Sequence, residues 1–126
     1  MAGEQILVVE DNEKNMKLFR DVLQAAGYRT LGAATGTRAV ELATEHRPDL
    51  VLMDIQLPDI DGVEALGRLR ADRRTAPITV LAVTAQAMQG DRERFLAAGF
   101  DGYLSKPVDI VALLDTVKRH CDGRGR

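Results

Sequence analysis

The chain has little of the residue types that mark secreted or aromatic-rich proteins. Its 126 residues include one cysteine, no tryptophan and 4% aromatic side chains. The single Cys121 cannot form a disulfide within the chain, which excludes a disulfide-stapled scaffold and fits a reducing compartment. With so few aromatic rings, the core must be built from aliphatic side chains and alanine. We expect a cytoplasmic protein.

Long apolar runs and a strong net charge are also absent. The longest apolar stretch, residues 78–85, contains two threonines and is far shorter than the roughly 20 residues that span a bilayer. No basic-then-apolar signal segment opens the chain. A formal net charge of −2 gives no general electrostatic attraction to nucleic acid or to an anionic membrane. We therefore expect no direct binding to either.

The length predicts one domain. Single domains most often have about 100–150 residues, and a chain of this size buries enough surface for a core of its own. The sequence has no Ser/Gly-rich linker and no internal repeat. We expect one domain over residues 1–126, with a core at about 5–121 and a tail at 122–126.

Two kinds of segment alternate along the chain. Short apolar runs rich in β-branched residues occur at 6–9, 50–53 and 78–84, and weaker runs occur at 28–34 and 102–105. Continuous apolar runs are typical of strands buried on both faces, as in parallel sheets. Helical patterns between them cover residues around 16–26, 38–47, 63–69, 86–98 and 110–117. Five β-then-α units with right-handed crossovers predict an α/β fold, a doubly wound parallel sheet flanked by five helices.

Polar side chains lie where the predicted strands end. Glu10 and Asp11 follow the first strand, Asp54 ends the third, Thr84 ends the fourth, and Lys106 follows the fifth. Ligands of an open parallel sheet bind outside the carboxyl ends of its strands, so these side chains should converge at one edge. Each has a simpler explanation by itself: a helix-capping acid, a β-branched strand end or a solvated lysine. Their coincidence at four strand ends favours a common site.

A cluster of this composition suits phosphoryl transfer. Two like charges about 4 Å apart repel each other by about 4 kcal/mol at an effective dielectric of about 20, so three carboxylates need a cation. Oxygen ligands and room for a phosphate favour Mg²⁺. With the lysine as a second positive charge, the site can stabilise a phosphoryl group, and Asp54 is the candidate nucleophile.

These residues carry a resemblance to a known family. The sequence resembles the receiver domains of two-component response regulators through Ile6-Leu7-Val8-Val9-Glu10-Asp11-Asn12, Leu52-Met53-Asp54-Ile55-Gln56-Leu57-Pro58 with Asp61-Gly62, Val83-Thr84-Ala85, and Lys106-Pro107. The ordered set covers essentially the whole chain. It implies the flavodoxin-like strand order 2-1-3-4-5 and a cis peptide bond before Pro107.

The resemblance implies a chemical role for several of these positions. Asp54 is expected to accept a phosphoryl group from a histidine kinase or a histidine phosphotransfer protein. The side chains of Asp11 and Asp54 and the main-chain carbonyl of Gln56 would ligate Mg²⁺, with Glu10 acting through a bound water. The glutamate stands where aspartate is commoner, and its longer reach leaves a more direct metal contact open. Thr84 and Lys106 would bind the phosphoryl oxygens.

The resemblance also implies a conformational switch. When Thr84 moves toward the phosphoryl group, Tyr103 would turn inward to fill the space behind it. The predicted helix at 86–98 contains Gly90 and a charged run, so it should be among the less stable helices. This helix, the fifth strand and the fifth helix would form the output face for a downstream protein. The protein would be a signalling domain rather than an enzyme, promoting only its own phosphorylation and dephosphorylation.

The remaining motif residues are expected to be structural. Pro58, Gly62 and Pro107 would shape the loops beside the site. Asp61 precedes the third predicted helix, so it should cap that helix rather than bind metal.

Several alternatives are less well supported. A haloacid-dehalogenase-type phosphatase needs a second Asp two residues after the nucleophile, where this chain has Gln56. A flavin-phosphate binder needs a Ser/Thr/Gly-rich loop after the first strand, where residues 10–13 would repel phosphate. A docking module that works without phosphorylation has no feature in its favour. A stand-alone regulator is favoured over a receiver excised from a larger regulator, and Arg70, Arg73 and Arg74 are expected to form a solvated loop.

Overall fold

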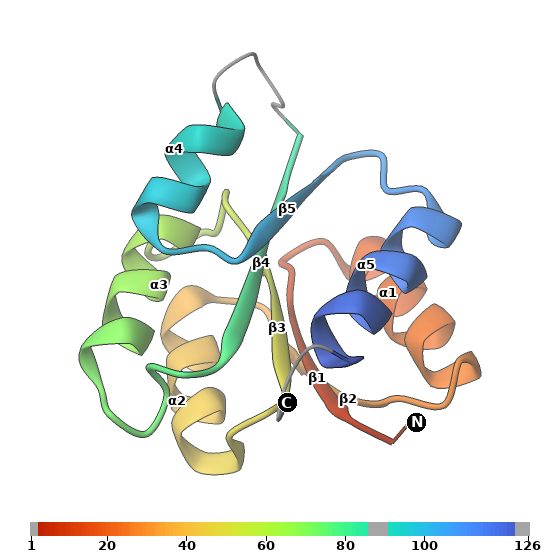
Figure 1. Ribbon diagram of the computed structural model, residues 1–126, viewed down its shortest axis with the longest axis horizontal. Coiled ribbons are helices and arrows are strands. Elements are labelled where there is room, and N and C mark those ends of the chain that lie inside the picture. Colours follow the sequence, from red (N-terminus) through yellow and green to blue (C-terminus); the bar gives the residue numbers. More distant parts are fainter. Residues whose placement is uncertain (1–2, 86–90, 123–126) are drawn as a thin grey trace.

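The computed structural model describes residues 3–85 and 91–122, and of residues 91 and 92 only their place in a helix. Strands and helices alternate strictly along the chain (Figure 1). The elements are β1 (Gln5–Val9), α1 (Glu13–Ala25), β2 (Arg29–Ala33), α2 (Gly36–His46), β3 (Leu50–Asp54), α3 (Gly62–Ala71), β4 (Thr79–Thr84), α4 (Asp91–Ala98), β5 (Gly102–Ser105) and α5 (Ile110–Asp122). The alternation confirms the five predicted β-then-α units.

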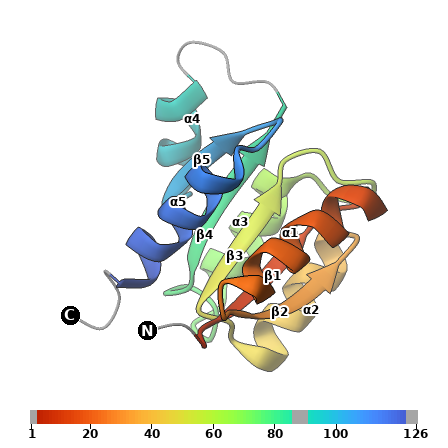
Figure 2. The same cartoon turned by 90° about the vertical axis from the view of Figure 1, so that its right-hand side faces the viewer.

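The five strands form one parallel sheet in the order β2-β1-β3-β4-β5. Helices α1 and α5 lie on one face of this sheet, and α2, α3 and α4 lie on the other (Figures 1 and 2). The predicted doubly wound fold and its strand order are therefore confirmed. Because the chain reverses its direction of winding between β1 and β3, a crevice opens beyond the carboxyl ends of these two strands.

The central strands are buried on both faces, which explains their unbroken apolar sequences. Every residue of β3 is buried. Successive side chains point to opposite faces of the sheet. Val51 and Met53 pack with side chains of α2 and α3, whereas Leu50 and Leu52 pack with side chains of α1 and α5. The buried apolar residues are mostly Leu, Val, Ile and Ala, as the shortage of aromatic rings predicted.

Capping side chains set helix bounds that differ slightly from the predicted ones. Helix α2 begins two residues before the expected position, because the Thr35 hydroxyl accepts a hydrogen bond from the Arg38 amide. It ends at His46, and Arg47 adopts a left-handed conformation with φ 48°. Asp61 caps α3 as predicted.

Two predicted segments extend beyond the described residues. The helix expected at 86–98 is described as α4 only over Asp91–Ala98, and residues 86–90 lie outside the described part. Helix α5 extends through Asp122, one residue into the expected tail, and residues 123–126 are not described. Among the helices that are described, none combines the length and apolar character needed to cross a membrane.

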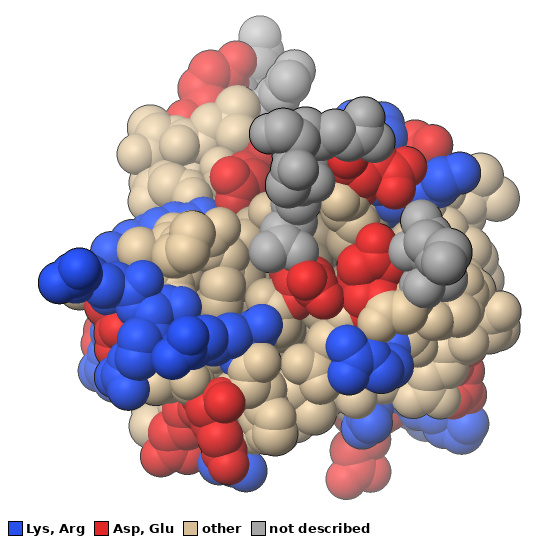
Figure 3. Space-filling view, turned by 60° about the horizontal axis from the view of Figure 1, so that its bottom comes forward, with Lys and Arg blue, Asp and Glu red and all other residues tan. Residues whose placement is uncertain are grey.

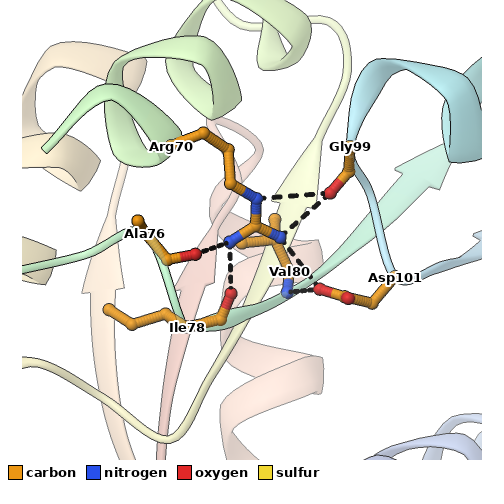
Figure 4. A network of polar contacts seen from close by, with 6 residues as sticks. All are labelled: Arg70, Ala76, Ile78, Val80, Gly99 and Asp101. Atoms are coloured by element: carbon orange, nitrogen blue, oxygen red, sulfur yellow. Dashed lines mark hydrogen bonds and ion pairs between the residues drawn. The ribbon is translucent and has the colours of Figure 1, made fainter. Parts of the chain in front are cut away.

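The basic cluster at the end of α3 is only partly solvated. Figure 3 shows Lys and Arg side chains gathered on the side of the molecule where α3 ends. Arg73 and Arg74 are exposed, as expected. The prediction is wrong for Arg70, whose guanidinium donates hydrogen bonds to three backbone carbonyls (Figure 4). These partners lie 6 to 29 residues further along the chain, and no local pattern indicates them.

Candidate functional site

The sheet brings the predicted site residues together at its carboxyl edge. β1 pairs with β3, β3 with β4, and β4 with β5, so residues that end or follow these strands are neighbours. Glu10 follows β1, Asp54 ends β3, Thr84 ends β4, and Lys106 follows β5. The Lys106 amide donates a hydrogen bond to the Thr84 carbonyl at 2.7 Å, which fixes the start of the loop after β5.

The Lys106 ammonium lies between two buried carboxylates. Its Nζ is 2.8 Å from Glu10 Oε1 and 2.9 Å from Asp54 Oδ2. Glu10 is 2% exposed and Asp54 is 5% exposed. The peptide bond from Lys106 to Pro107 is cis, as the resemblance implied.

Three carboxylates approach one another closely enough to share a cation. Glu10, Asp11 and Asp54 each place an oxygen within 4.8 Å of the others, and Asp11 is exposed to solvent. Within the described part of the chain, Lys106 is the one cation with an ion pair to these acids, so the cluster keeps an excess of negative charge. Oxygen donors of this kind suit a hard divalent cation such as Mg²⁺, which binds through one or two carboxylates and keeps several waters. The residues present therefore fit the predicted metal.

Burial and charge shift the pKa values of two of these groups. Burial raises the pKa of the Glu10 carboxyl, and the hydrogen bonds from Lys106 and the Asn12 amide only partly oppose this rise. Burial alone would lower the pKa of the Lys106 ammonium, but Glu10 and Asp54 outweigh it, so the pKa is raised. Lys106 is therefore held in its charged form, whereas burial disfavours the charged form of the Glu10 carboxyl.

The backbone around Asp54 leaves no space for a side chain at position 62. The Gly62 amide donates to the Ile55 carbonyl at 2.8 Å, which closes the loop after β3. A Cβ at Gly62 would lie 2.6 Å from the Asp54 carbonyl oxygen and 2.9 Å from Ile55 Cα. Within the same loop, the Gln56 amide donates to Asp54 Oδ1 at 2.9 Å. The motif glycine is thus required by the close approach of its neighbours.

An open cleft of about 530 Å³ adjoins the acidic cluster. Its lining combines charged, polar and apolar side chains from three loops and the start of α1. These residues are Glu10, Asp11, Asn12, Asn15, Asp54, Gln56, Leu57, Pro58 and Lys106. The first turn of α1 thus contributes an amide, that of Asn15, which the sequence analysis missed.

Thr84 and Tyr103 lie beside the acidic cluster rather than within it. Thr84 is buried at the end of β4. Tyr103 is half-buried on β5, and its ring centroid is 6.1 Å from that of Phe95 on α4. Of the two predicted switch residues, Tyr103 is thus in contact with α4.

A further acid, Asp59, anchors the loop after Asp54 and was also missed. Its carboxylate accepts hydrogen bonds from the Gly36 and Thr37 amides at 2.8 and 2.9 Å. The hydrogen bonds from Thr37, first that of its side chain, hold the pKa of Asp59 below its ordinary value. The loop that carries Gln56 is thereby tied to the N-terminus of α2. Its partners are 23 and 22 residues away, so no sequence pattern indicated the contact.

Fold and site together define a response-regulator receiver. The chain belongs to the response regulator receiver domain family, whose model matches residues 6–118. It is similar to the polar-differentiation response regulator DivK of Brucella anthropi, with 48% identity over 117 residues, which are 93% of this chain and 95% of that protein. DivK of Brucella ovis is 47% identical over the same length. The predicted receiver domain of a two-component system is confirmed.

Solved structures agree with this assignment. The receiver domain of the sensor histidine kinase PA1611 from Pseudomonas aeruginosa PAO1 has a TM-score of 0.89 and 39% identity, over 97% of this chain and 100% of that one. That structure holds a magnesium ion coordinated in its active site cleft. The chemotaxis response regulator CheY4 of Vibrio cholerae has a TM-score of 0.88 and 27% identity, over 94% and 99% of the two chains.

Proposed function

We propose that Asp54 accepts a phosphoryl group from the phosphohistidine of a histidine kinase or a histidine phosphotransfer protein. One observation carries this proposal. Asp54 is a nearly buried carboxylate beside an open cleft, and its Oδ2 lies 2.9 Å from the Lys106 ammonium within a cluster of three acids. Glu10 shares this burial, this cation and this cleft, and Asp54 is distinguished from it by the receiver motif in which it lies.

The transfer needs position and charge more than covalent chemistry. A carboxylate oxygen of Asp54 attacks the phosphorus, and the P–N bond to the donor imidazole breaks. The electron pair of that bond goes to the imidazole nitrogen, and an acyl phosphate remains on Asp54. The Gln56 amide and the Lys106 ammonium hold the two carboxylate oxygens before the attack.

Mg²⁺ is proposed as the cofactor of this reaction. The side chains of Asp11 and Asp54 and the main-chain carbonyl of Gln56 would hold it. When bound, Mg²⁺ supplies positive charge that offsets the carboxylates and the phosphoryl oxygens. Glu10 is proposed to act through water, because Oε1 pairs with Lys106 at 2.8 Å and Oε2 accepts the Asn12 amide at 3.2 Å. Oε1 thus has an ion-pair partner and Oε2 a hydrogen-bond donor in the protein.

Thr84 and Lys106 are proposed to bind the phosphoryl oxygens. A hydroxyl and an ammonium at neighbouring strand ends can stabilise the charge that the phosphate brings, about −1.5 to −2. Thr84 would move toward that charge, and Tyr103 would turn into the space left behind it. Helix α4, β5 and α5 would then present a changed surface to a downstream protein.

We further propose that residues 1–126 act as one cytoplasmic signalling domain. It would work through protein contacts and not by direct binding to nucleic acid or membrane. It would catalyse no reaction other than its own phosphorylation and dephosphorylation. The match to DivK of Brucella anthropi covers 93% of this chain and 95% of that protein.

The phosphoacceptor is tested with a small phosphodonor. Acetyl phosphate with Mg²⁺ should add one phosphoryl group to the wild-type protein, as measured by intact mass. Asp54→Asn keeps the shape but loses the attacking anion, so no addition is expected. The matched control Asp61→Asn keeps a good helix cap and should be labelled like the wild type. Equal labelling of Asp54→Asn and the wild type would refute the assignment.

A further inference from the structure

Helix α4 is attached to the sheet by few side chains. Among residues 93–98, only Phe95 is buried, and Leu96 is 42% exposed. The Phe95 ring packs against Phe100 at a centroid distance of 5.9 Å and against Tyr103 at 6.1 Å. The middle of the helix thus has one large anchor, and that anchor touches the proposed switch residue.

The C-terminal end of α4 is held by a network centred on Arg70, in the last turn of α3 (Figure 4). Arg70 Nη1 donates to the Ala76 and Ile78 carbonyls at 2.8 and 2.6 Å. Nη2 donates to the Gly99 carbonyl and the Asp101 carboxylate, both at 2.9 Å. Nε donates to the Gly99 carbonyl as well, at 3.3 Å. One planar guanidinium therefore joins α3, the loop before β4 and the turn after α4.

The same network reaches the second residue of β4 and the residue that precedes β5. The Asp101 carboxylate accepts the Val80 amide at 2.8 Å, and the Asp101 amide donates to the Val80 carbonyl at 2.8 Å. Gly99 has φ +114°, a conformation that side chains rarely adopt, so the turn that ends α4 favours glycine here. These contacts define a fixed point at the amino end of β4.

The other end of α4 follows the proposed site. β4 runs from the Arg70 network to Thr84, and its residues from Val80 to Thr84 are buried. At roughly 3.3 Å per residue, Thr84 lies about 13 Å along the strand from Val80. In chain order, α4 is the next described element after β4, and residues 86–90 between them lie outside the described part. The C-terminal end of the helix is tied to a network remote from Asp54, and Phe95 in its middle contacts Tyr103, the residue proposed to respond to Thr84.

We infer that Arg70 is a positioning residue of the switch: it fixes the C-terminal end of α4, so that a shift of Thr84 turns the helix about this end. The inference rests on the proposed function. A turn about this end carries Phe95 past Tyr103, which couples the two residues. Without the fixed end, the same shift would loosen the turn after α4 and leave Phe95 in place.

The test compares hydrogen exchange in the free and the activated protein. Beryllofluoride with Mg²⁺ serves as the phosphoryl mimic, and NMR follows the Gly99, Phe100 and Asp101 amides. These amides donate to the carbonyls of Leu96, Phe95 and Val80, so they report on the fixed end. In the wild type they should be equally protected in both states, while amides of α4 change.

Arg70→Lys keeps the charge but loses the planar fork. We expect the three reporter amides to exchange at least about ten-fold faster in the activated state than in the free state of this variant. A purely structural role would accelerate exchange by the same factor in both states, and that result would overturn the inference. Arg74→Lys is the matched control, because the Arg74 guanidinium pairs with Asp72 at the surface, and it should behave like the wild type.

A second variant guards against misfolding of the first. Asp101→Asn keeps an acceptor for the Val80 amide and removes the charge that faces Arg70, so a smaller effect of the same kind is expected. Identical protection in both states of both variants would also overturn the inference. A wild type that shows no beryllofluoride response around Asp54 would contradict the proposed function, and the inference with it. A normal response around Asp54 without the reporter effect contradicts the inference alone.

Discussion

Lys106 and Arg70 are two partly buried cations at opposite ends of β4, and their surroundings differ. Their side chains are similarly shielded, at 20% and 26% exposed. Lys106 is in contact with two carboxylates, and a third lies within 4.8 Å of them. Arg70 is in contact with three neutral carbonyls and a single carboxylate. Lys106 thus faces more negative charges than its own single positive charge can balance. Arg70 faces one negative charge, which balances its own.

This difference separates the end of β4 that is proposed to bind a ligand from the end where one side chain joins α3, β4 and the turn after α4. At the Lys106 end, negative charge remains uncompensated and burial raises the pKa of Glu10. Binding of a cation lowers the free energy of such a cluster. At the Arg70 end, each guanidinium nitrogen already donates to at least one acceptor.

The sharpest test of the comparison removes each cation in turn. Lys106→Met leaves two buried carboxylates unpaired and should cost about 3 kcal/mol of unfolding free energy without metal. Arg70→Met leaves buried carbonyls without donors and should cost about 2–3 kcal/mol. Mg²⁺ should restore much of the loss in Lys106→Met and none of it in Arg70→Met. Urea unfolding with and without Mg²⁺ measures both effects, and equal restoration in the two variants would contradict the comparison.

Asp11 tests whether the excess charge is what binds the metal. In the wild type, Mg²⁺ at a hundred times its Kd should add about 2.7 kcal/mol of stability. Asp11→Ala removes a ligand and relieves carboxylate repulsion together. This variant should melt at or above the wild-type temperature without metal and gain little from Mg²⁺. Thermal melts under both conditions decide the matter, and a full Mg²⁺ response in the variant would place the metal elsewhere.

Two glycines of α3 test how tightly the site end is packed. Gly62→Ala places a Cβ 2.6 Å from the Asp54 carbonyl oxygen and should cost about 2 kcal/mol, with weaker labelling of Asp54. Gly67→Ala is the matched control, since its Cβ would meet nothing within 4 Å. It should gain about 1 kcal/mol from helix propensity. Urea unfolding gives both free energies. An unchanged unfolding free energy in Gly62→Ala would show that the loop after Asp54 can move to make room for the added Cβ.

The smallest effect is expected from Glu10 and depends on pH. Its raised pKa means that the folded protein binds this proton more tightly than the unfolded chain. Stability from this group is therefore lost as pH rises from about 4.3 through the folded pKa. Without Mg²⁺ at neutral pH, Glu10→Gln should melt a few degrees above the wild type. For a domain of this size, about 1 kcal/mol of stability corresponds to roughly 4 °C in melting temperature. The two melting temperatures should converge below about pH 4; a constant difference across pH would refute this account.

The sequence predicted the fold and the convergence of the site because both follow from local patterns. Alternating apolar runs and helical periods indicated the five units, and parallel strands bring their carboxyl ends to one edge. The cluster of Glu10, Asp54 and Lys106 follows from that rule alone. The role of each residue in phosphorylation stays a prediction.

What the sequence did not predict depends on contacts between distant segments. Arg70 meets its partners across as many as 31 residues, and nothing in its own segment distinguishes it from the exposed Arg73 and Arg74. Asp59 likewise meets α2 across 22 residues. A charged side chain has the same local sequence pattern whether it is solvated or hydrogen-bonded to a distant segment. Only the packed structure separates the two.

The sheet order has a consequence for where a signal can leave the molecule. β5 is an edge strand, hydrogen-bonded to β4 alone. A displacement of β5 therefore disturbs one ladder of hydrogen bonds, whereas a displacement of β1, β3 or β4 would disturb two. Edge strands also invite pairing between molecules, and a short edge limits that risk of aggregation. β5 has four residues, so the edge that it offers for such pairing is short, and it carries Tyr103 on the strand that is hydrogen-bonded on one side alone.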